Sequence, residues 1–365
     1  MPKTLEPTEL LDAVDLRARV DKALGEFLEG QAPGFDAIGA DLSPLMGAAH
    51  DFVLDSGKRL RPAFAYWGWR AAGGDDGEEI VRAAASLELV HACALVHDDV
   101  MDGSDTRRGQ PAMHRRFAAL HRGESWHGDP EGFGVSAAIL LGDIYLVWAD
   151  TMLRSCGLPA EALLRAKPVY DTMRIELMAG QYLDVLEQAA GEASVERARR
   201  VARYKTAKYT IERPLHLGAT LAAGSADALS ALSRYGLPLG EAFQLRDDVL
   251  GVFGDPSETG KPAGDDLREG KRTVLIAEAL SVATPGQRAL VSRLLGDPRL
   301  DAEGVAGLRE VLVETGALDA TERRIAAGLD EALAALDTAS AQGVLDTTAC
   351  IALRELAVAA TARTV

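Results

Sequence analysis

Apolar residues recur at helical spacing along most of this chain, and this regularity limits the folds that it can adopt. The spacing is clearest in residues 81–97, 135–153, 166–189, 200–223 and 322–339. Alternating β-branched runs, which mark half-buried strands, are scarce. Clusters of Gly, Pro and Asp break the pattern at 71–78, 122–134, 254–266 and 295–304. The sequence therefore predicts an all-α protein of many helices joined by a few loops.

Composition and charge exclude several classes of function. The formal net charge is −16, which disfavours binding to nucleic acid or to an anionic membrane. With 47% hydrophobic residues in 365, the chain can bury a large core. The three cysteines form no CxxC pair, the N-terminal residues do not resemble a signal peptide, and no uncharged apolar run is long enough to cross a bilayer. We expect a cytoplasmic protein that does not insert into membranes.

Two acidic clusters end apolar helical stretches. In "HDDVMDGSDTRRG", residues 97–109, Asp98 and Asp102 are four residues apart and share one face of a helix with His91. In "FQLRDDVLGVFGD", residues 243–255, Asp247 and Asp248 again follow an apolar run. Like charges at helical spacing repel each other unless something neutralises them. A solvated helix end would explain one such cluster but not two, so a divalent-metal site is the better interpretation.

The ligand chemistry favours magnesium or manganese over zinc, because the clusters offer oxygen ligands without thiols. Magnesium usually completes its coordination with water and substrate phosphate oxygens. The carboxylates therefore imply a phosphate-bearing ligand, and clustered cations fit it: "SGKRLRP" at 56–62, Arg107 and Arg108 after the first cluster, and Lys261 and Lys271 after the second. The histidines of the 121–134 loop, His121 and His127, have no suitably spaced carboxylate and are expected to be solvated rather than metal ligands.

These motifs resemble the trans-type polyprenyl (isoprenyl) diphosphate synthases, most of all a bacterial geranylgeranyl diphosphate synthase. "HDDVMDGSDTRRG" resembles the family's first motif, DDxxD followed by RRG, and "GKRLRP" resembles its basic entry motif. "MAGQYLD", "YKTAKYT" and the stretch from 243 to 273 follow in the family's order. The resemblance implies one domain over 1–365, a helical bundle around a deep central cavity, with the motif-bearing core at about 57–273 and C-terminal helices at about 285–365.

The resemblance also implies a reaction, the head-to-tail condensation of isopentenyl diphosphate with an allylic diphosphate. Three Mg²⁺ ions, with Mn²⁺ as a substitute, would be held by Asp98 and Asp102 from one side and Asp247 from the other. The remaining members of the acidic pairs, Asp99 and Asp248, belong to the same motifs. The family usually forms homodimers.

Further roles follow from the resemblance position by position. The isopentenyl diphosphate site would comprise Gly57, Lys58, Arg61, His91 and Arg108. The allylic diphosphate would be bound by Arg107, Lys205, Lys261 and Lys271. Thr206 and Gln244 would place oxygen dipoles near the developing carbocation.

One departure concerns the second motif, which often reads DDxxD. Gly251 stands here where the third carboxylate is expected, and Asp255 is a candidate for partial substitution. Because Asp247 is the expected direct ligand, we still predict an active enzyme with a weaker third metal site.

The length of the product depends on the side chain that closes the cavity. The positions one turn below Asp98 are Ala94 and Cys93, with Val90 a turn further, and none is the bulky aromatic that stops growth at fifteen carbons in this family. Tyr145 and Trp148 are candidates for a deeper floor, although both are also plausible core or dimer-interface residues. We favour geranylgeranyl diphosphate, with farnesyl or longer polyprenyl products as alternatives.

Three other classes stay open. A class I terpene cyclase also uses acidic metal motifs, but it would not need "GKRLRP" and Arg108, since it binds no second diphosphate. A non-catalytic subunit of a heteromeric synthase typically loses motif residues, and here only Gly251 departs. A purely structural helical protein would leave the clustered charges unexplained.

Overall fold

The computed structural model describes residues 15–55, 57–190, 194–254, 264–297 and 299–362. These residues are almost entirely helical, which confirms the predicted all-α class. The chain divides into two compact units. The first comprises Met1–Tyr170, Pro214–Leu229 and Leu345–Leu353, and the second comprises Asp171–Arg213, Ser230–Val344 and Arg354–Val365.

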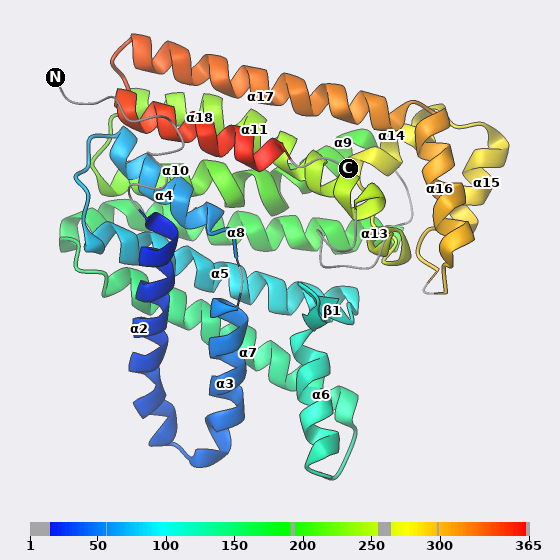
Figure 1. Cartoon of the computed structure of the whole chain (residues 1–365), viewed down its shortest axis with the longest axis horizontal. Helices are drawn as coiled ribbons and strands as arrows, with labels where there is room; N and C mark the ends of the chain where they lie inside the picture. Colours follow the sequence, from blue (N-terminus) through cyan, green and yellow to red (C-terminus); the bar gives the residue numbers. More distant parts are fainter. Residues whose placement is uncertain (1–14, 56, 191–193, 255–263, 298, 363–365) are drawn as a thin grey trace. The chain divides into compact units, whose positions relative to one another are not determined.

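The first unit is organised around α5, Glu78–Asp102. Buried residues occur on all sides of this helix, because α2, α3, α4 and α7 pack against it. In Figure 1, both α2 and α3 are drawn in blue. Helix α2 runs away from α5, and α3 runs back towards it. The elements that lie in this unit are α2 (Leu16–Asp36), η1 (Ala40–Leu42), α3 (Ser43–Leu54), α4 (Leu60–Ala71), α6 (Met113–Gly123), α7 (Pro130–Arg154) and most of α10 (Arg213–Leu221).

A short antiparallel hairpin interrupts the helices. Strand β1, Thr106–Arg107, pairs with β2, Gln110–Pro111. The two residues between them, Arg108 and Gly109, both have left-handed backbone, with φ of 54° and 75°. Two successive residues of this kind form the two-residue turn that matches the twist of paired strands, and glycine is favoured at its second position. The hairpin was not predicted, since four strand residues have no measurable periodicity.

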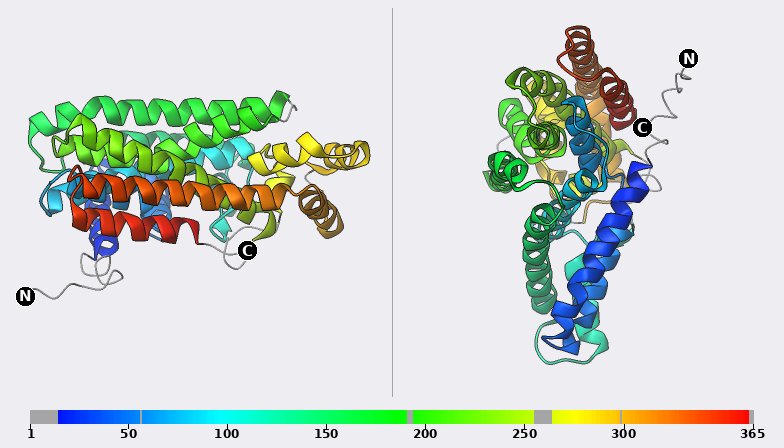
Figure 2. Two further views of the ribbon diagram at one scale, coloured as in Figure 1. Left: turned by 90° about the horizontal axis from the view of Figure 1, so that it is seen from above. Right: turned by 90° about the vertical axis from the view of Figure 1, so that its left-hand side faces the viewer.

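The second unit contains the long helix α17, Ala317–Ala341. Its buried residues fall on one face, from Thr321 and Ile325 to Leu336 and Ala339, as the 322–339 periodicity predicted. Figure 2 shows α14, α15 and α16 gathered at the N-terminal end of this helix. The further elements of this unit are α9 (Val195–Val201), η2 (Ala202–Glu212), α13 (Asp265–Arg268), α14 (Val274–Val282), α15 (Pro285–Leu294) and α16 (Ala302–Glu314).

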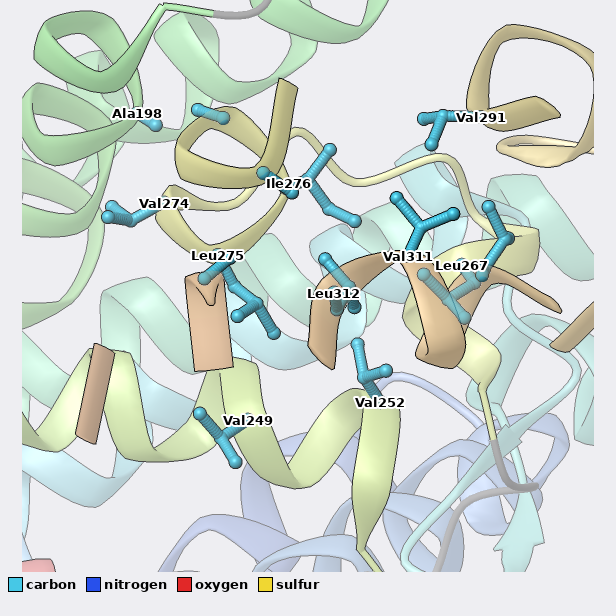
Figure 3. Packing of buried hydrophobic residues seen from close by; sticks show 14 of the residues in the cluster. Ala198, Val249, Val252, Leu267, Val274, Leu275, Ile276, Val291, Val311 and Leu312 are labelled. Atoms are coloured by element: carbon cyan, nitrogen blue, oxygen red, sulfur yellow. The ribbon is translucent and has the colours of Figure 1, made fainter. Parts of the chain in front are cut away.

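The core of the second unit is built from aliphatic side chains of α11 (Ala226–Phe253), α14 and α16 (Figure 3). Val249 and Val252 on α11 pack with Leu275 and Leu312, and all four are at most 1% exposed. Val249 and Val252 follow the second acidic pair closely in the sequence. Packing therefore fixes the part of α11 that carries Asp247 and Asp248.

Three long helices, α8 (Ala160–Ala190), α11 (Ala226–Phe253) and α18 (Thr347–Thr361), contribute residues to both units. The stretch 200–223, in which apolar residues recur at helical spacing, is divided among α9, η2 and α10. Segment η2 is π-helical over eleven residues, with a wider winding than an α-helix. An apolar pattern of helical period does not distinguish the two windings.

Two helices, α5 and α7, are long and apolar enough by length and composition to cross a membrane. The most apolar part of α5 is 72% buried in the structure, and that of α7 is 39% buried. The core helix of a soluble protein passes the same test, so this is weak evidence for a membrane span. The three cysteines are buried.

Candidate active site

The first acidic cluster lies at the C-terminal end of α5. The helix ends at Asp102, and Gly103 follows with left-handed backbone at φ 65°. Asp98 and Asp102 lie on one face as predicted, while Asp99 is fully buried. Carboxylates at a helix C-terminus are unfavourable because this end of the helix dipole is already negative. The cluster therefore requires nearby positive charge.

The hairpin supplies part of that charge. Nε of Arg107 donates a hydrogen bond of 2.8 Å to Oδ1 of Asp99, and a second nitrogen of its guanidinium contacts the same carboxylate. The same group lies 3.4 Å from Oδ2 of Asp98. The tight turn at Arg108 and Gly109 thus folds the chain back onto the end of α5. This arrangement explains why the sign of the charge reverses within a few residues.

A second group of cations surrounds His91. Burial lowers the pKa of the His91 imidazole well below its ordinary value, and Arg61, Arg108 and Arg107 lower it further. Burial also lowers the pKa of the Arg108 guanidinium, with Glu88 acting in the opposite direction. These effects place Arg61, Arg107 and Arg108 around a neutral imidazole, whereas Lys58 is exposed beside Gly57 before α4. Of the residues predicted for the isopentenyl site, Arg61 and Arg108 are thus close enough to His91 for their charges to act on it.

The second acidic cluster lies on α11. Asp248 is 5% exposed, and burial raises the pKa of its carboxyl to about 7. Nε2 of Gln244, one turn earlier, donates a hydrogen bond of 2.6 Å to Oδ1 of Asp248. Asp247 is half-buried. In this structure the Gln244 amide therefore supports the acidic pair, a contact that the sequence did not indicate.

The departure at Gly251 has a structural explanation. A β-carbon built on Gly251 would lie 1.8 Å from Oδ2 of Asp266, which belongs to α13. The Asp266 carboxylate therefore occupies the space beside α11 where a side chain of residue 251 would begin. Lys271 Nζ lies 3.3 Å from Oδ1 of Asp266 and 2.6 Å from Oε2 of Glu269. Asp255 and Lys261, named above as candidate site residues, lie outside the described residues.

Lys205 and Thr206 lie on η2. Lys205 Nζ forms an ion pair of 2.7 Å with Oδ2 of Asp184 on α8. The backbones approach closely here, since a β-carbon on Gly180 would lie 2.4 Å from the backbone nitrogen of Lys205. Gly180 and Asp184 both belong to the "MAGQYLD" motif. Asp184 is thus the partner of a predicted site residue, and sequence reasoning gave it no role, although its motif was noticed.

The candidate floor residues lie in the first unit. Tyr145 is fully buried and donates a hydrogen bond of 2.8 Å to the carbonyl oxygen of Ala49, while its ring stacks with Phe52 at 6.2 Å. The ring centroid of Trp148 lies 6.0 Å from that of Tyr145. On α5, Val90 and Cys93 are buried and Ala94 is half-buried. The two aromatics thus belong to a packed aromatic cluster, and their role in product length stays a prediction.

The expectation for His121 was wrong. Helix α6 continues to Gly123 and α7 begins at Pro130, so the loop is shorter than the predicted 121–134. His121 therefore falls on the buried face of α6, at 4% exposure. Its ring packs against Trp126 and Phe133 at 5.9 and 5.4 Å. Nε2 lies 3.1 Å from the carbonyl oxygen of His127.

Comparison with known proteins decides the family. The model of the family described as polyprenyl synthetase matches residues 43–312, which include both acidic clusters and both groups of cations. The chain belongs to the polyprenyl synthetase family. It is therefore a prenyltransferase, and the family depends on divalent metal ions.

Relatives of this polyprenyl synthetase are named for products of different lengths. It is 34% identical over 284 residues to the geranylfarnesyl diphosphate synthase of Aeropyrum pernix, covering 77% of this chain and 83% of the relative. It is also 34% identical over 285 residues to the geranylgeranyl diphosphate synthase of Mycobacterium tuberculosis, covering 78% and 76%. The crystal structure of geranylgeranyl pyrophosphate synthase from Corynebacterium glutamicum, complexed with isoprenyl diphosphate and magnesium, matches with a TM-score of 0.91 and 44% identity over 99% of this chain and 100% of that one.

The donor atoms of the acidic clusters fit a hard divalent cation. The carboxylates offer oxygen ligands, as Mg²⁺ prefers. Among the described residues, no three His, Cys, Asp or Glu side chains are arranged to hold an ion by themselves. An ion bound by either described cluster would need further oxygen ligands from water or substrate, as magnesium at phosphate sites normally does.

Proposed function

We propose that this polyprenyl synthetase condenses isopentenyl diphosphate head-to-tail with allylic diphosphates and that its main product is geranylgeranyl diphosphate. The observation that carries the proposal is the end of α5, where Asp98 and Asp99 contact Arg107, together with His91 on the same helix, on which Arg61 and Arg108 act. An acidic face can bind metal-bridged diphosphate, and a separate cationic group can bind a second diphosphate directly. Two diphosphate sites distinguish a synthase from a cyclase.

The residues divide between the two substrates. Asp98, Asp102 and Asp247 would hold Mg²⁺, three ions being expected with Mn²⁺ as a substitute. When bound, the ions neutralise the departing diphosphate. Arg107, Lys205, Lys261 and Lys271 hold the allylic diphosphate, whereas Gly57, Lys58, Arg61, His91 and Arg108 hold isopentenyl diphosphate.

Bond formation then depends on orientation. When diphosphate leaves the allylic substrate, an allylic carbocation remains. The double bond of isopentenyl diphosphate attacks this carbocation, and the resulting adduct gives up a proton to the released diphosphate. Dipoles of Thr206 and Gln244 stabilise the positive charge without capturing it. A neutral His91 donates a hydrogen bond without adding charge, in keeping with its lowered pKa.

Product length rests on the small residues below Asp98 and on the aromatic cluster of Tyr145 and Trp148. Val90, Cys93 and Ala94 leave the two turns of α5 that precede Asp98 without a bulky barrier. Relatives named for products of twenty and twenty-five carbons agree with a floor deeper than that of a farnesyl diphosphate synthase. A longer polyprenyl product is the alternative.

The deciding experiment incubates the purified protein with Mg²⁺, isopentenyl diphosphate and, separately, dimethylallyl, geranyl and farnesyl diphosphate. Chromatography of the dephosphorylated products should show mainly the twenty-carbon alcohol, and chelation by EDTA should abolish it. Hydrocarbon release would instead indicate a cyclase. Complete inertness with every primer would indicate a non-catalytic subunit and would overturn the proposal.

We also propose that the two units form a single catalytic domain of a homodimeric, cytoplasmic enzyme.

The homodimer is supported by exposed apolar side chains. They occur at seven-residue spacing on α7, at Leu140 and Val147, and on α8, at Ile175 and Tyr182. Such seams normally pack against another helix. Light scattering should give 77.4 kDa, twice the 38.7 kDa of one chain. Tyr182→Asp should lower this mass, and the control Val313→Asp, at an exposed residue of α16, should not.

A further inference from the structure

Arg59 differs from the other cations of the "GKRLRP" stretch because it is buried. Its side chain is 4% exposed, and it immediately precedes α4. Its backbone is left-handed, with φ of 52°, a conformation that glycine and asparagine adopt far more readily than arginine. An arginine in this position therefore needs a reason beyond turn formation. Its side-chain contacts provide one.

The Arg59 guanidinium joins three helices of the first unit. Nε donates a hydrogen bond of 2.7 Å to Oδ1 of Asp21 on α2, and Nη2 donates one of 2.7 Å to the carbonyl oxygen of Val53 on α3. Nη1 donates one of 2.9 Å to Oε2 of Glu88 on α5. The planar group thus has a partner in each of three directions. A lysine has one nitrogen and could not reproduce this geometry.

Glu88 connects this anchor to the predicted isopentenyl site. Its side chain is 4% exposed, and it lies one helical turn before His91 on α5. It also acts electrostatically on Arg108. One buried carboxylate therefore both fixes Arg59 and offsets the cations grouped around His91.

Gly57 makes room for the same anchor. A β-carbon on Gly57 would lie 2.7 Å from Nη1 of Arg59, and the glycine has φ of 153°. The family resemblance assigned Gly57 to substrate binding. In the structure, the Arg59 guanidinium occupies the space that a side chain of residue 57 would take.

We propose that Arg59 is a positioning residue for isopentenyl diphosphate, holding Lys58 and Arg61 in place through its ion pair with Glu88. The inference rests on the proposed function. Lys58 precedes the anchored residue and Arg61 follows it by two positions, so the direction of both side chains depends on the turn that Arg59 holds. A buried ion pair is weak evidence for stability, because apolar side chains of similar size often stabilise as well. A role in orienting Lys58 and Arg61 explains the buried pair better than a contribution to stability does.

The test compares Michaelis constants for the two substrates in Arg59→Met and in the double variant Arg59→Met/Glu88→Gln, which leaves no unpaired buried carboxylate. We expect the KM for isopentenyl diphosphate to rise at least about tenfold, the size of effect expected when hydrogen bonds to a charged group are lost. The KM for the allylic substrate should change less than twofold. Arg17→Met is the matched control, since Arg17 is exposed and lies 4.0 Å from the same Asp21.

A purely structural role would lower the melting temperature and the active fraction without separating the two Michaelis constants. If neither methionine variant folds, Arg59→Lys decides the question: a raised KM for isopentenyl diphosphate alone supports the inference, and unchanged constants overturn it. Calorimetric titration with isopentenyl diphosphate alone should show the same loss of affinity. Failure of the wild-type enzyme to elongate any primer would refute the proposed function, whereas an elongating wild type with unaffected variants would refute only the role of Arg59.

Discussion

Oδ2 of Asp266 lies 1.8 Å from the position that a β-carbon on Gly251 would take. No ordinary side chain fits at residue 251 while Asp266 keeps this place. The position that departs from the common DDxxD pattern is thus filled by a carboxylate from α13, next to Lys271. Gly251 therefore makes room for the Asp266 carboxylate beside the second acidic cluster.

Gly251→Ala should therefore reduce activity, because the added carbon displaces the Asp266 carboxylate and with it the Lys271 contact. We expect kcat/KM to fall roughly 10- to 100-fold, the usual effect of losing a supporting contact at a metal-dependent site. Gly251→Asp, which restores the common motif, should be no more active than Gly251→Ala. Gly286→Ala is the control, since a β-carbon there meets nothing within 4 Å. Full activity in Gly251→Asp would contradict this account.

Asp98→Ala and Asp247→Ala should each abolish turnover, because each removes an expected metal ligand. Far-ultraviolet circular dichroism should show unchanged helicity. Asp105→Ala serves as the control within the first motif, since its side chain is 78% exposed and paired with Arg115. Undiminished product formation in either of the first two variants would refute the metal assignment.

Trp148→Ala should lengthen the products if the aromatic cluster is the floor of the cavity. Removing the ring costs about 3–5 kcal/mol of stability, so the assay is best run well below the melting temperature. Tyr145→Phe keeps the ring that stacks on Phe52 and loses only the hydrogen bond to Ala49, so its products should match those of the wild type. An unchanged product distribution in Trp148→Ala would exclude this floor.

The loss of stability on acidification should depend in part on Glu176. Burial alone would raise the pKa of its carboxyl, but hydrogen bonds from Arg213 and Lys208 outweigh burial and lower the pKa. The unfolded chain then binds the proton more readily, so the stabilisation is complete at neutral pH and is lost as the pH falls below about 4.

Urea unfolding of Glu176→Gln and of the wild type, at neutral pH and below about pH 4, checks this dependence. The variant should be about 2 kcal/mol less stable than the wild type at neutral pH, and the difference should shrink in acid. Asp337→Asn, which alters an exposed ion pair with Arg354, should show little effect at either pH. A constant deficit for Glu176→Gln would contradict the lowered pKa.

The sequence predicted the helices and the acidic clusters because both leave a local signature. Apolar periodicity identified α5, α7 and α17, and the position of Asp98 and Asp102 on one helix face is confirmed. The division of 200–223 was missed because π-helical winding has no separate apolar period. The burial of His121 was missed because the end of α6 lies in a glycine-rich stretch.

Partners far apart in the sequence could not be predicted from local pattern. Asp184 is 21 residues from Lys205, and Glu88 is 29 residues from Arg59. In the sequence, Arg59 is one of three cations within four residues, and nothing distinguishes it from Lys58 or Arg61. Folding distinguishes them, because it buries Arg59 while Lys58 stays exposed and Arg61 is half-buried.

The winding of η2 restricts how this segment can evolve. Two glycines approach its backbone: Gly180 lies against Lys205, and Gly240 would place a β-carbon 2.7 Å from the Cα of Ala207. Deleting Thr206, the residue between these contacts, would rewind the segment towards α-helical geometry and rotate one contact away from its glycine. Side-chain replacements are compatible with this constraint, but changes in length are not. Homologous chains should therefore align across Ala202–Glu212 without gaps, even where their residues differ.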